Sequence, residues 1–251
     1  GGTQAALDVA RAKRGKHFAP EVVDAFCAVA DEVLGDPKAE YDWSGLIDAE
    51  PALQKGLTED QLDDALEAIA DFTDLRSIAR AGHSRATAEL AAAAARQWGL
   101  PEAEVTLVRR AALVHDLGMH GIPATILEKP GPLAAGERER LRMHPYYTER
   151  MLASTPALAR VGAVASLAHE RGDGSGYHRG LRAAAIPATA RLLAAACAYR
   201  AMTEPRAHRP ALGAKSATAE LRADVRAGRL DADAGDAVLA AAGQAHGKRR
   251  G

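Results

Sequence analysis

Aromatic residues and long apolar runs are scarce in this sequence. Phenylalanine, tyrosine and tryptophan make up 4% of the 251 residues, while alanine and leucine recur in segments such as AELAAAAARQW. This composition favours helices packed through small side chains over a β-sandwich. No apolar stretch approaches the roughly 20 residues that span a bilayer, and the first residues lack the apolar segment of a signal peptide. We therefore expect an all-α protein that resides in the cytoplasm and has no membrane partner.

An excess of one charge and an abundance of cysteine are also missing. The 32 basic and 33 acidic residues give a formal net charge of -1, so no global charge attracts nucleic acid or an anionic membrane surface. The two cysteines, Cys27 and Cys197, lie far apart within apolar helical patterns. This argues against a disulfide framework and fits reduced thiols in an intracellular protein.

The chain divides at a loose, acidic connection. Pro20 suits a first helical turn and predicts a helix over 20–35, after which residues 36–57 contain prolines and glycines. Thr58 and Gln61 form a capping box that opens a helix reaching about residue 74. The remaining predicted helices span 74–98, 102–117, 137–153, 157–170, 187–203, 214–227 and 231–242. We expect an N-terminal helical segment (1–57), a helical domain (58–245) and a basic tail or linker (246–251).

Two segments of the chain echo one another. FAPEVVDAF at 18–26 aligns with LDADAGDAV at 230–238, each following a basic turn that contains glycine. One interpretation is that two unrelated amphipathic helices have similar caps. The other is that residues 1–35 are the tail of a preceding copy of the same domain.

Histidines recur at intervals of about one helical hairpin. They are His83 in AGHSRATAEL, His115 beside Asp116 in RRAALVHDLGMHGIP, His144 in RLRMHPYYTERML and His169 in LAHERGDGSGYHRGL. Successive helices of a bundle can present such residues to a common centre. Imidazoles with a carboxylate are suitable ligands for a divalent ion that activates water, whereas a His-Asp pair alone is more often a cap or a salt link.

These motifs together resemble the HD-GYP family, a branch of the HD-domain metal-dependent phosphohydrolases. HDLGMHGIP is similar to the HD motif and its Gly-Ile-Pro turn, and HERGDGSGYHRGL is similar to the GYP loop. IPATARLLAAACAYRAMTEPRAHRPAL is similar to the helix and arm that follow. The resemblance runs from His83 to about residue 210. It implies an HD-type helical bundle that holds two or three iron, manganese or similar ions and opens cyclic di-GMP.

The resemblance also implies roles for individual residues. The implied metal ligands are His83, His115, Asp116, His144 and His169. The implied catalytic residues are Asp116 and Glu170, although Glu170 could instead stabilise the loop. The residues expected to contact a nucleotide or phosphodiester ligand are Gly174, Gly176, Tyr177, Arg179, Arg200 and Arg206.

Several positions depart from the family pattern. Met119 stands where the family has a lysine, and Ala168 where it has the first of two histidines. Cys197 and Arg200 replace aspartates, His178 replaces the proline of GYP, and Ala79 stands where some members have a glutamate. A thiolate at Cys197 would shift the preference from iron or manganese towards zinc. The remaining ligands suffice for one divalent ion (iron, manganese or zinc) in an incomplete site.

Other polar residues beside the motifs have simpler explanations. Turn histidines such as His120 and His178 are usually exposed, and Asp173 before Gly174 favours an Asx-turn. Arg206, His208 and Arg209 form either an anion-binding arm or a solvated connection.

Three functions remain open at this point. The first is a degenerate HD-GYP domain that senses a nucleotide or phosphate ligand and regulates a signalling or transcription-regulating protein. Nucleic acid would then be bound only through an attached domain outside this chain. The second is an active metal-dependent cyclic di-GMP phosphodiesterase, and the third is a ligand-free scaffold that forms a homodimer.

Overall fold

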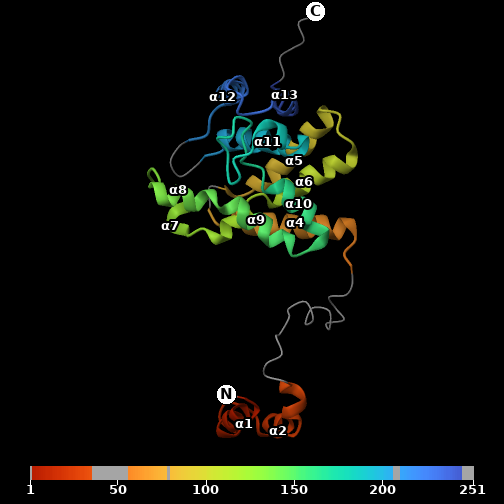
Figure 1. The fold of residues 1–251 in the computed structure, drawn as a ribbon, viewed down its shortest axis with the longest axis vertical. Coiled ribbons are helices and arrows are strands. Elements are labelled where there is room, and N and C mark those ends of the chain that lie inside the picture. Colours follow the sequence, from red (N-terminus) through yellow and green to blue (C-terminus); the bar gives the residue numbers. More distant parts are fainter. Residues whose placement is uncertain (1, 36–55, 78–79, 206–209, 245–251) are drawn as a thin grey trace, which may run out of the picture. The chain divides into compact units, whose positions relative to one another are not determined.

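The structure is a computed structural model that describes residues 2–35, 56–77, 80–205 and 210–244. Its contacts divide the chain into two units, Gly1–Leu57 and Thr58–Gly251. The described residues form helices and no strands (Figure 1), so the all-α prediction is confirmed. None of the described helices combines the length and the apolar character needed to cross a membrane.

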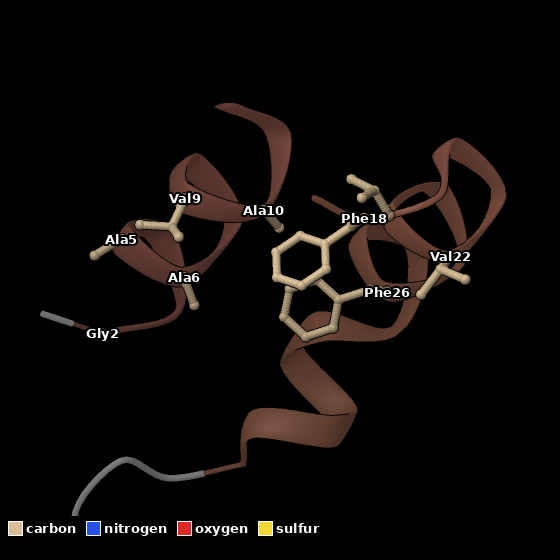
Figure 2. A pocket seen from close by; sticks show the side chains of 9 residues that line it. Gly2, Ala5, Ala6, Val9, Ala10, Phe18, Val22 and Phe26 are labelled. Atoms are coloured by element: carbon tan, nitrogen blue, oxygen red, sulfur yellow. The ribbon is translucent and has the colours of Figure 1, made fainter. Parts of the chain in front are cut away.

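The first unit contains two helices, α1 (Thr3–Ala12) and α2 (Pro20–Leu34). They pack on each other through small and branched side chains, and Val23 and Ala30 are buried. A cavity of about 630 Å³ lies in this unit, with the rings of Phe18 and Phe26 projecting into the space beside α1 (Figure 2). Every residue that lines the cavity is apolar or glycine. It therefore offers no side chain that could hold an ion or a phosphate.

The second unit is a bundle of longer helices joined by short helical turns. In chain order its elements are α4 (Glu59–Asp74), α5 (His83–Gln97), α6 (Glu102–Val114), η2 (Leu117–Gly121), α7 (Ala124–Leu127), α8 (Ala135–Arg142), α9 (His144–Ala153), α10 (Pro156–Ala165), η3 (Ala183–Ala185), α11 (Ala188–Thr203), α12 (Ala214–Arg226) and α13 (Ala232–Ala241). Helix α4 begins with the predicted capping box, in which Thr58 and Gln61 exchange hydrogen bonds.

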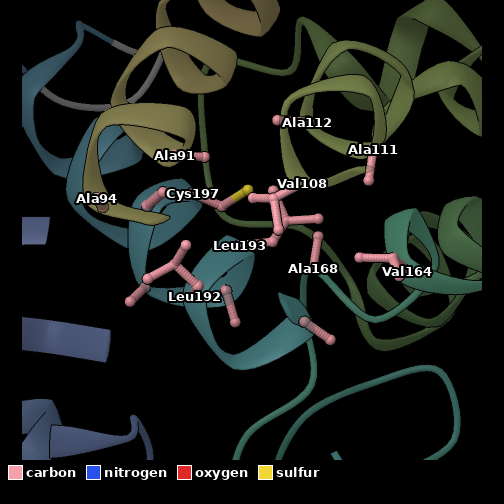
Figure 3. Packing of buried hydrophobic residues seen from close by; sticks show 14 of the residues in the cluster. Ala91, Ala94, Val108, Ala111, Ala112, Val164, Ala168, Leu192, Leu193 and Cys197 are labelled. Atoms are coloured by element: carbon pink, nitrogen blue, oxygen red, sulfur yellow. The ribbon is translucent and has the colours of Figure 1, made fainter. Parts of the chain in front are cut away.

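Small side chains build the core of this bundle. Helix α5 packs against α6, α11 and α13, and Ala91, Ala95 and Ala112 are fully buried at these contacts. Figure 3 shows Val108 of α6 and Cys197 of α11 within the same core. Because alanine lets helix backbones approach closely, the alanine-rich runs specify the close packing of α5, α6 and α11.

Several predicted helix boundaries differ in the structure. The helix predicted to reach about residue 74 ends as α4 at Asp74, whereas the helix predicted over 74–98 begins only at His83, as α5. Gly82 takes a left-handed conformation there, with a φ of 76°. The buried Asp74 carboxylate accepts hydrogen bonds from the backbone N–H and the hydroxyl of Ser84, at 2.8 and 2.7 Å. Asp74 therefore satisfies a free N–H of the first turn of α5 from outside that helix.

The helix predicted over 137–153 is divided at Met143. Pro145 lies in the first turn of α9, where its missing N–H is tolerated, whereas inside a continuous helix it would remove a hydrogen bond. The helix predicted over 157–170 ends earlier, at Ala165. As a result, His144 begins a helix and His169 lies in the turn after α10.

Candidate metal centre

Five side chains predicted to be metal ligands meet at the ends of four helices. His83 begins α5, His115 and Asp116 follow the end of α6, His144 begins α9, and His169 follows α10. The chain reverses direction at these points, so residues far apart in sequence reach one centre. His83, His115, Asp116 and His144 are almost fully buried, and the side chain of His169 is 20% exposed.

The Asp116 carboxylate lies between two pairs of imidazoles. Its Oδ2 atom lies 3.1 Å from His115 Nε2 and 3.8 Å from His83 Nε2. Its Oδ1 atom lies 3.2 Å from His144 Nε2 and 3.7 Å from His169 Nε2. We name these the Oδ2 triad (His83, His115 and Asp116) and the Oδ1 triad (Asp116, His144 and His169). Each triad brings its ligand atoms close enough to hold a metal ion.

Hydrogen bonds on the far side of the rings fix how the histidines face the centre. His115 Nδ1 donates to the carbonyl of Ala112 at 2.7 Å, and His144 Nδ1 donates to the carbonyl of Leu141 at 2.8 Å. His83 Nδ1 lies 2.5 Å from the Glu204 carboxylate. With their protons held at Nδ1, the rings of His115 and His144 direct Nε2 towards Asp116, which is the usual arrangement of metal-bound histidines.

Burial keeps three of the histidines, His115, His144 and His169, neutral. Loss of solvation lowers the pKa of His144 to about 4, and it lowers the pKa of His115 well below its usual value. Burial, followed by the neighbouring His144, does the same to the pKa of His169. At neutral pH the rings are therefore in the unprotonated form that binds metals.

The Oδ1 triad has the character of a site built for a cation. Asp116 Oδ1, His144 Nε2 and His169 Nε2 are buried and have no hydrogen-bond partner in the described part of the chain. The three atoms face one another, and buried polar atoms without a partner are costly. Two imidazole nitrogens and a carboxylate oxygen suit zinc, iron or manganese. The residues present therefore fit a divalent metal ion, as predicted.

The Oδ2 triad has a cation of its own. The Arg80 guanidinium donates a hydrogen bond to Asp116 Oδ2, and the Arg80 side chain is 14% exposed. Neither Arg80 nor Glu204 was among the predicted site residues. The only sequence signal for Arg80 is a basic residue in the turn before His83, and Glu204 carries no motif that links it to His83.

A cavity of about 280 Å³ opens onto the cluster. Its walls include all five predicted ligands together with Arg80, Met119, Leu141, Tyr177, Cys197 and Ala201. Cys197 therefore lies at the cluster, but it brings a buried thiol where the family has a carboxylate. Met119 likewise brings no charge, so among the described residues Asp116 is the only carboxylate in this wall.

The loop after His169 lies beside this cavity. Tyr177 stacks on His169 with ring centres 5.0 Å apart, and the Arg142 guanidinium lies 5.1 Å from the Tyr177 ring centre. A side chain at Gly176 would overlap the backbone of Glu170 and Arg171, so the loop needs glycine there.

The buried Glu170 carboxylate holds this loop rather than facing the cluster. Its Oε1 accepts a hydrogen bond from the N–H of Arg179, and its Oε2 accepts one from the N–H of Leu181, both at 2.8 Å. Both oxygens are thus engaged by loop backbone, and Glu170 is not part of the cavity wall. This geometry suits a residue that positions the loop, and the catalytic role of Glu170 stays a prediction.

The other described residues that were predicted to contact a ligand lie outside the cavity wall. Arg179 is exposed and pairs with Glu149, and Arg200 donates to Glu204 at 2.6 Å. Gly174 lies in a turn in which the Asp173 carboxylate accepts the N–H of Ser175 at 2.9 Å, and this confirms the predicted Asx-turn. Ala168 is buried in the hydrophobic core. The positions outside the described residues are Ala79, Arg206, His208 and Arg209.

The expectation that His120 and His178 are exposed is wrong. His120 stacks on Phe72 with ring centres 5.0 Å apart, and His178 packs edge-on against Tyr146. Both are half-buried because these aromatic rings cover them. Neither lines the cavity, so neither replaces a missing ligand.

Comparison with known proteins agrees with this geometry. Residues 67–234 match the family model described as HD domain. The chain is 30% identical over 214 residues to 3'3'-cGAMP-specific phosphodiesterase 3 of Vibrio cholerae, covering 82% of this chain and 46% of that protein. It is 35% identical over 153 residues to a cyclic di-GMP phosphodiesterase of Thermotoga maritima, covering 60% of this chain and 42% of that protein.

A solved structure is similar as well. The crystal structure of a cyclic GMP-AMP specific phosphodiesterase of V. cholerae (V-cGAP3) matches with a TM-score of 0.57 and 27% identity, covering 96% of this chain and 56% of that chain. The chain spans less than half the length of the two curated relatives named above. The matched residues include every predicted metal ligand. The chain therefore belongs to the HD-domain family, as the HD-GYP resemblance predicted.

Proposed function

We propose that this chain is a metal-dependent regulatory domain that binds a cyclic dinucleotide, such as cyclic di-GMP or 3'3'-cGAMP, and hydrolyses it slowly or not at all. The observation that carries the proposal is the Asp116 carboxylate between four imidazoles beside an open cavity. The relatives named above are phosphodiesterases of these two nucleotides.

The chain's own residues supply a metal site and a surface for an anion. Asp116 and the histidines around it (His83, His115, His144 and His169) form the proposed metal site, and a divalent ion bound there would polarise a phosphoryl oxygen and lower the pKa of a bound water. Arg80 supplies a guanidinium, whose planar donors match phosphate oxygens. Tyr177 supplies an aromatic ring, on which a base can stack.

Two residues of the cavity wall support binding over turnover. Met119 has no charge to give a phosphate, and Cys197 offers no carboxylate for the centre. Electrostatic stabilisation of the developing charge is usually the largest catalytic contribution. Losing these two groups together should therefore reduce hydrolysis more than it reduces binding.

Calorimetric titration of the metal-loaded chain with cyclic di-GMP and with 3'3'-cGAMP tests the proposal. We expect binding of at least one of them, and loss of that binding in Asp116→Asn. His17→Ala is the matched control because His17 is an exposed histidine of the first unit. Absence of binding for both nucleotides would refute the proposal.

An active phosphodiesterase is the second candidate. It is favoured by the full set of five ligands, which converge with Asp116 shared between two triads. Product analysis after long incubation with either nucleotide distinguishes the two functions. Turnover that disappears in Asp116→Asn and persists in His17→Ala would make the chain an enzyme, and nucleotide recovered intact would leave it a binding domain.

A further inference from the structure

The two triads differ in what neutralises the Asp116 carboxylate. Arg80 donates to Oδ2, whereas Oδ1 has no hydrogen-bond partner in the described part of the chain. We infer that the Arg80 guanidinium takes the place of a second metal ion at the Oδ2 triad, so that the chain holds a single ion at the Oδ1 triad. This inference rests on the proposed metal site.

The position of Arg80 makes it a fixed charge of the site. An arginine guanidinium is positively charged in proteins, so Arg80 brings a positive charge to Asp116. Its side chain is mostly buried, and it lines the same cavity wall as His83, His115 and Asp116. An ion at the Oδ2 triad would have to displace this guanidinium or lie beside it, and like charges in such a site repel.

The number of carboxylates near the two triads favours one bound ion over two. Of the residues that the structure describes, Asp116 alone contributes a carboxylate to the cavity wall. Glu204 lies behind His83, and its other oxygen accepts a hydrogen bond from Arg200. Cys197 leaves the position on α11 without a carboxylate. One divalent ion together with Arg80 already exceeds the charge of Asp116, and a second ion would add two further positive charges.

This arrangement also favours an anionic ligand. With one ion bound, the net positive charge at the floor of the cavity attracts a phosphodiester. A guanidinium can then contact phosphate oxygens with two parallel hydrogen bonds. Arg80 is thus a candidate ligand-positioning residue as well as the substitute for an ion.

Removing Arg80 should change the number of ions bound. In Arg80→Ala, Asp116 Oδ2 and the Nε2 atoms of His83 and His115 become a second set of acceptors without a resident cation. We expect the chain to bind one Mn²⁺ per molecule and Arg80→Ala to bind two. Arg142→Ala is the matched control, because it removes one arginine beside Tyr177 and leaves Asp116 untouched.

The experiment titrates Mn²⁺ into metal-free protein and records both the stoichiometry and the electron paramagnetic resonance spectrum. A single ion gives an isolated Mn²⁺ signal, and two ions that share Asp116 give a coupled one. Arg80→Gln, which keeps a polar side chain without the charge, serves as a second variant. Circular dichroism verifies that each variant is folded.

Variants that remove a histidine from one triad only show which of the two triads holds the ion. His144→Ala should lose the single Mn²⁺, whereas His83→Ala should keep it. Two ions in the unaltered chain would overturn the inference, and so would one ion in both folded Arg80 variants. Absence of any Mn²⁺ from the unaltered chain is a distinct result, because it would overturn the proposed metal site itself.

Discussion

Replacing Glu170 with glutamine tests whether this residue holds the loop or takes part in chemistry. The glutamate side chain is 1% exposed and accepts one backbone N–H at each carboxylate oxygen, from Arg179 and from Leu181. Glutamine keeps one acceptor and turns an NH₂ group towards the other N–H. The variant thus loses one hydrogen bond to a charged acceptor and leaves a donor facing a donor.

The expected cost is about 2–3 kcal/mol of unfolding free energy, because a hydrogen bond to a charged group contributes about 1.5–3 kcal/mol. Glu149→Gln is a matched control. Glu149 also contacts Arg179, but through the exposed guanidinium. Such a partly exposed ion pair contributes about 1 kcal/mol or less.

Urea unfolding followed by circular dichroism at 222 nm measures both variants. We expect the midpoint of Glu170→Gln to fall clearly below that of Glu149→Gln, with the bound metal retained in both folded proteins. A Glu170→Gln protein of unchanged stability would refute the positioning role. A catalytic role would then gain support, most strongly if this variant had also lost hydrolysis of the nucleotide.

Three further predictions concern stability. Asp74→Ala should cost about 2 kcal/mol, because it removes the side chain that caps the first turn of α5, and urea unfolding checks this. In metal-free protein the pKa of His144 is about 4, below the ordinary value of about 6.5. Between about pH 4 and 6.5 the unfolded chain therefore binds more protons than the folded chain. Stability should thus fall by up to about 3 kcal/mol as the pH drops from 6.5 to 4, and His144→Gln should reduce that slope in urea titrations at several pH values. Gly176→Ala should cost about 3 kcal/mol by overpacking, whereas Gly131→Ala, with open space at its Cβ, should cost little; thermal melts that coincide would contradict this.

The five candidate metal ligands could be picked out from the sequence because each lies in a local motif at a helix end. The resemblance supplied the roles, and the bundle topology brought the residues together. His144 illustrates the physical basis, since Pro145 ends one helix and opens the next, and the imidazole is thereby placed at a helix start.

The contacts that tune the site could not be predicted because they join distant segments. Glu204 reaches His83 from 121 residues further along the chain, and no periodicity encodes that pairing. The break between α4 and α5 depends on the Asp74 carboxylate, which accepts the backbone N–H of Ser84 across a turn. The helical periodicity of the sequence does not indicate this contact either. Arg80 lies in this same break, in a turn that the sequence pattern places within the predicted helix over 74–98. Its contact with Asp116 depends on that turn and so could not be predicted.

Two expectations about assembly stay predictions. Before each echoed segment a glycine with positive φ, Gly15 or Gly228, lies in the turn between two helices. This is consistent with residues 1–35 being the tail of a preceding copy. The expected homodimer is checked by light scattering of the whole chain.

Metal content per chain tests the account most directly. Protein purified without chelators or metal-affinity resin should contain one equivalent of zinc, iron or manganese by elemental analysis, and Asp116→Asn should contain none. Protein without metal that also fails to take up Mn²⁺ or Zn²⁺ would contradict the account.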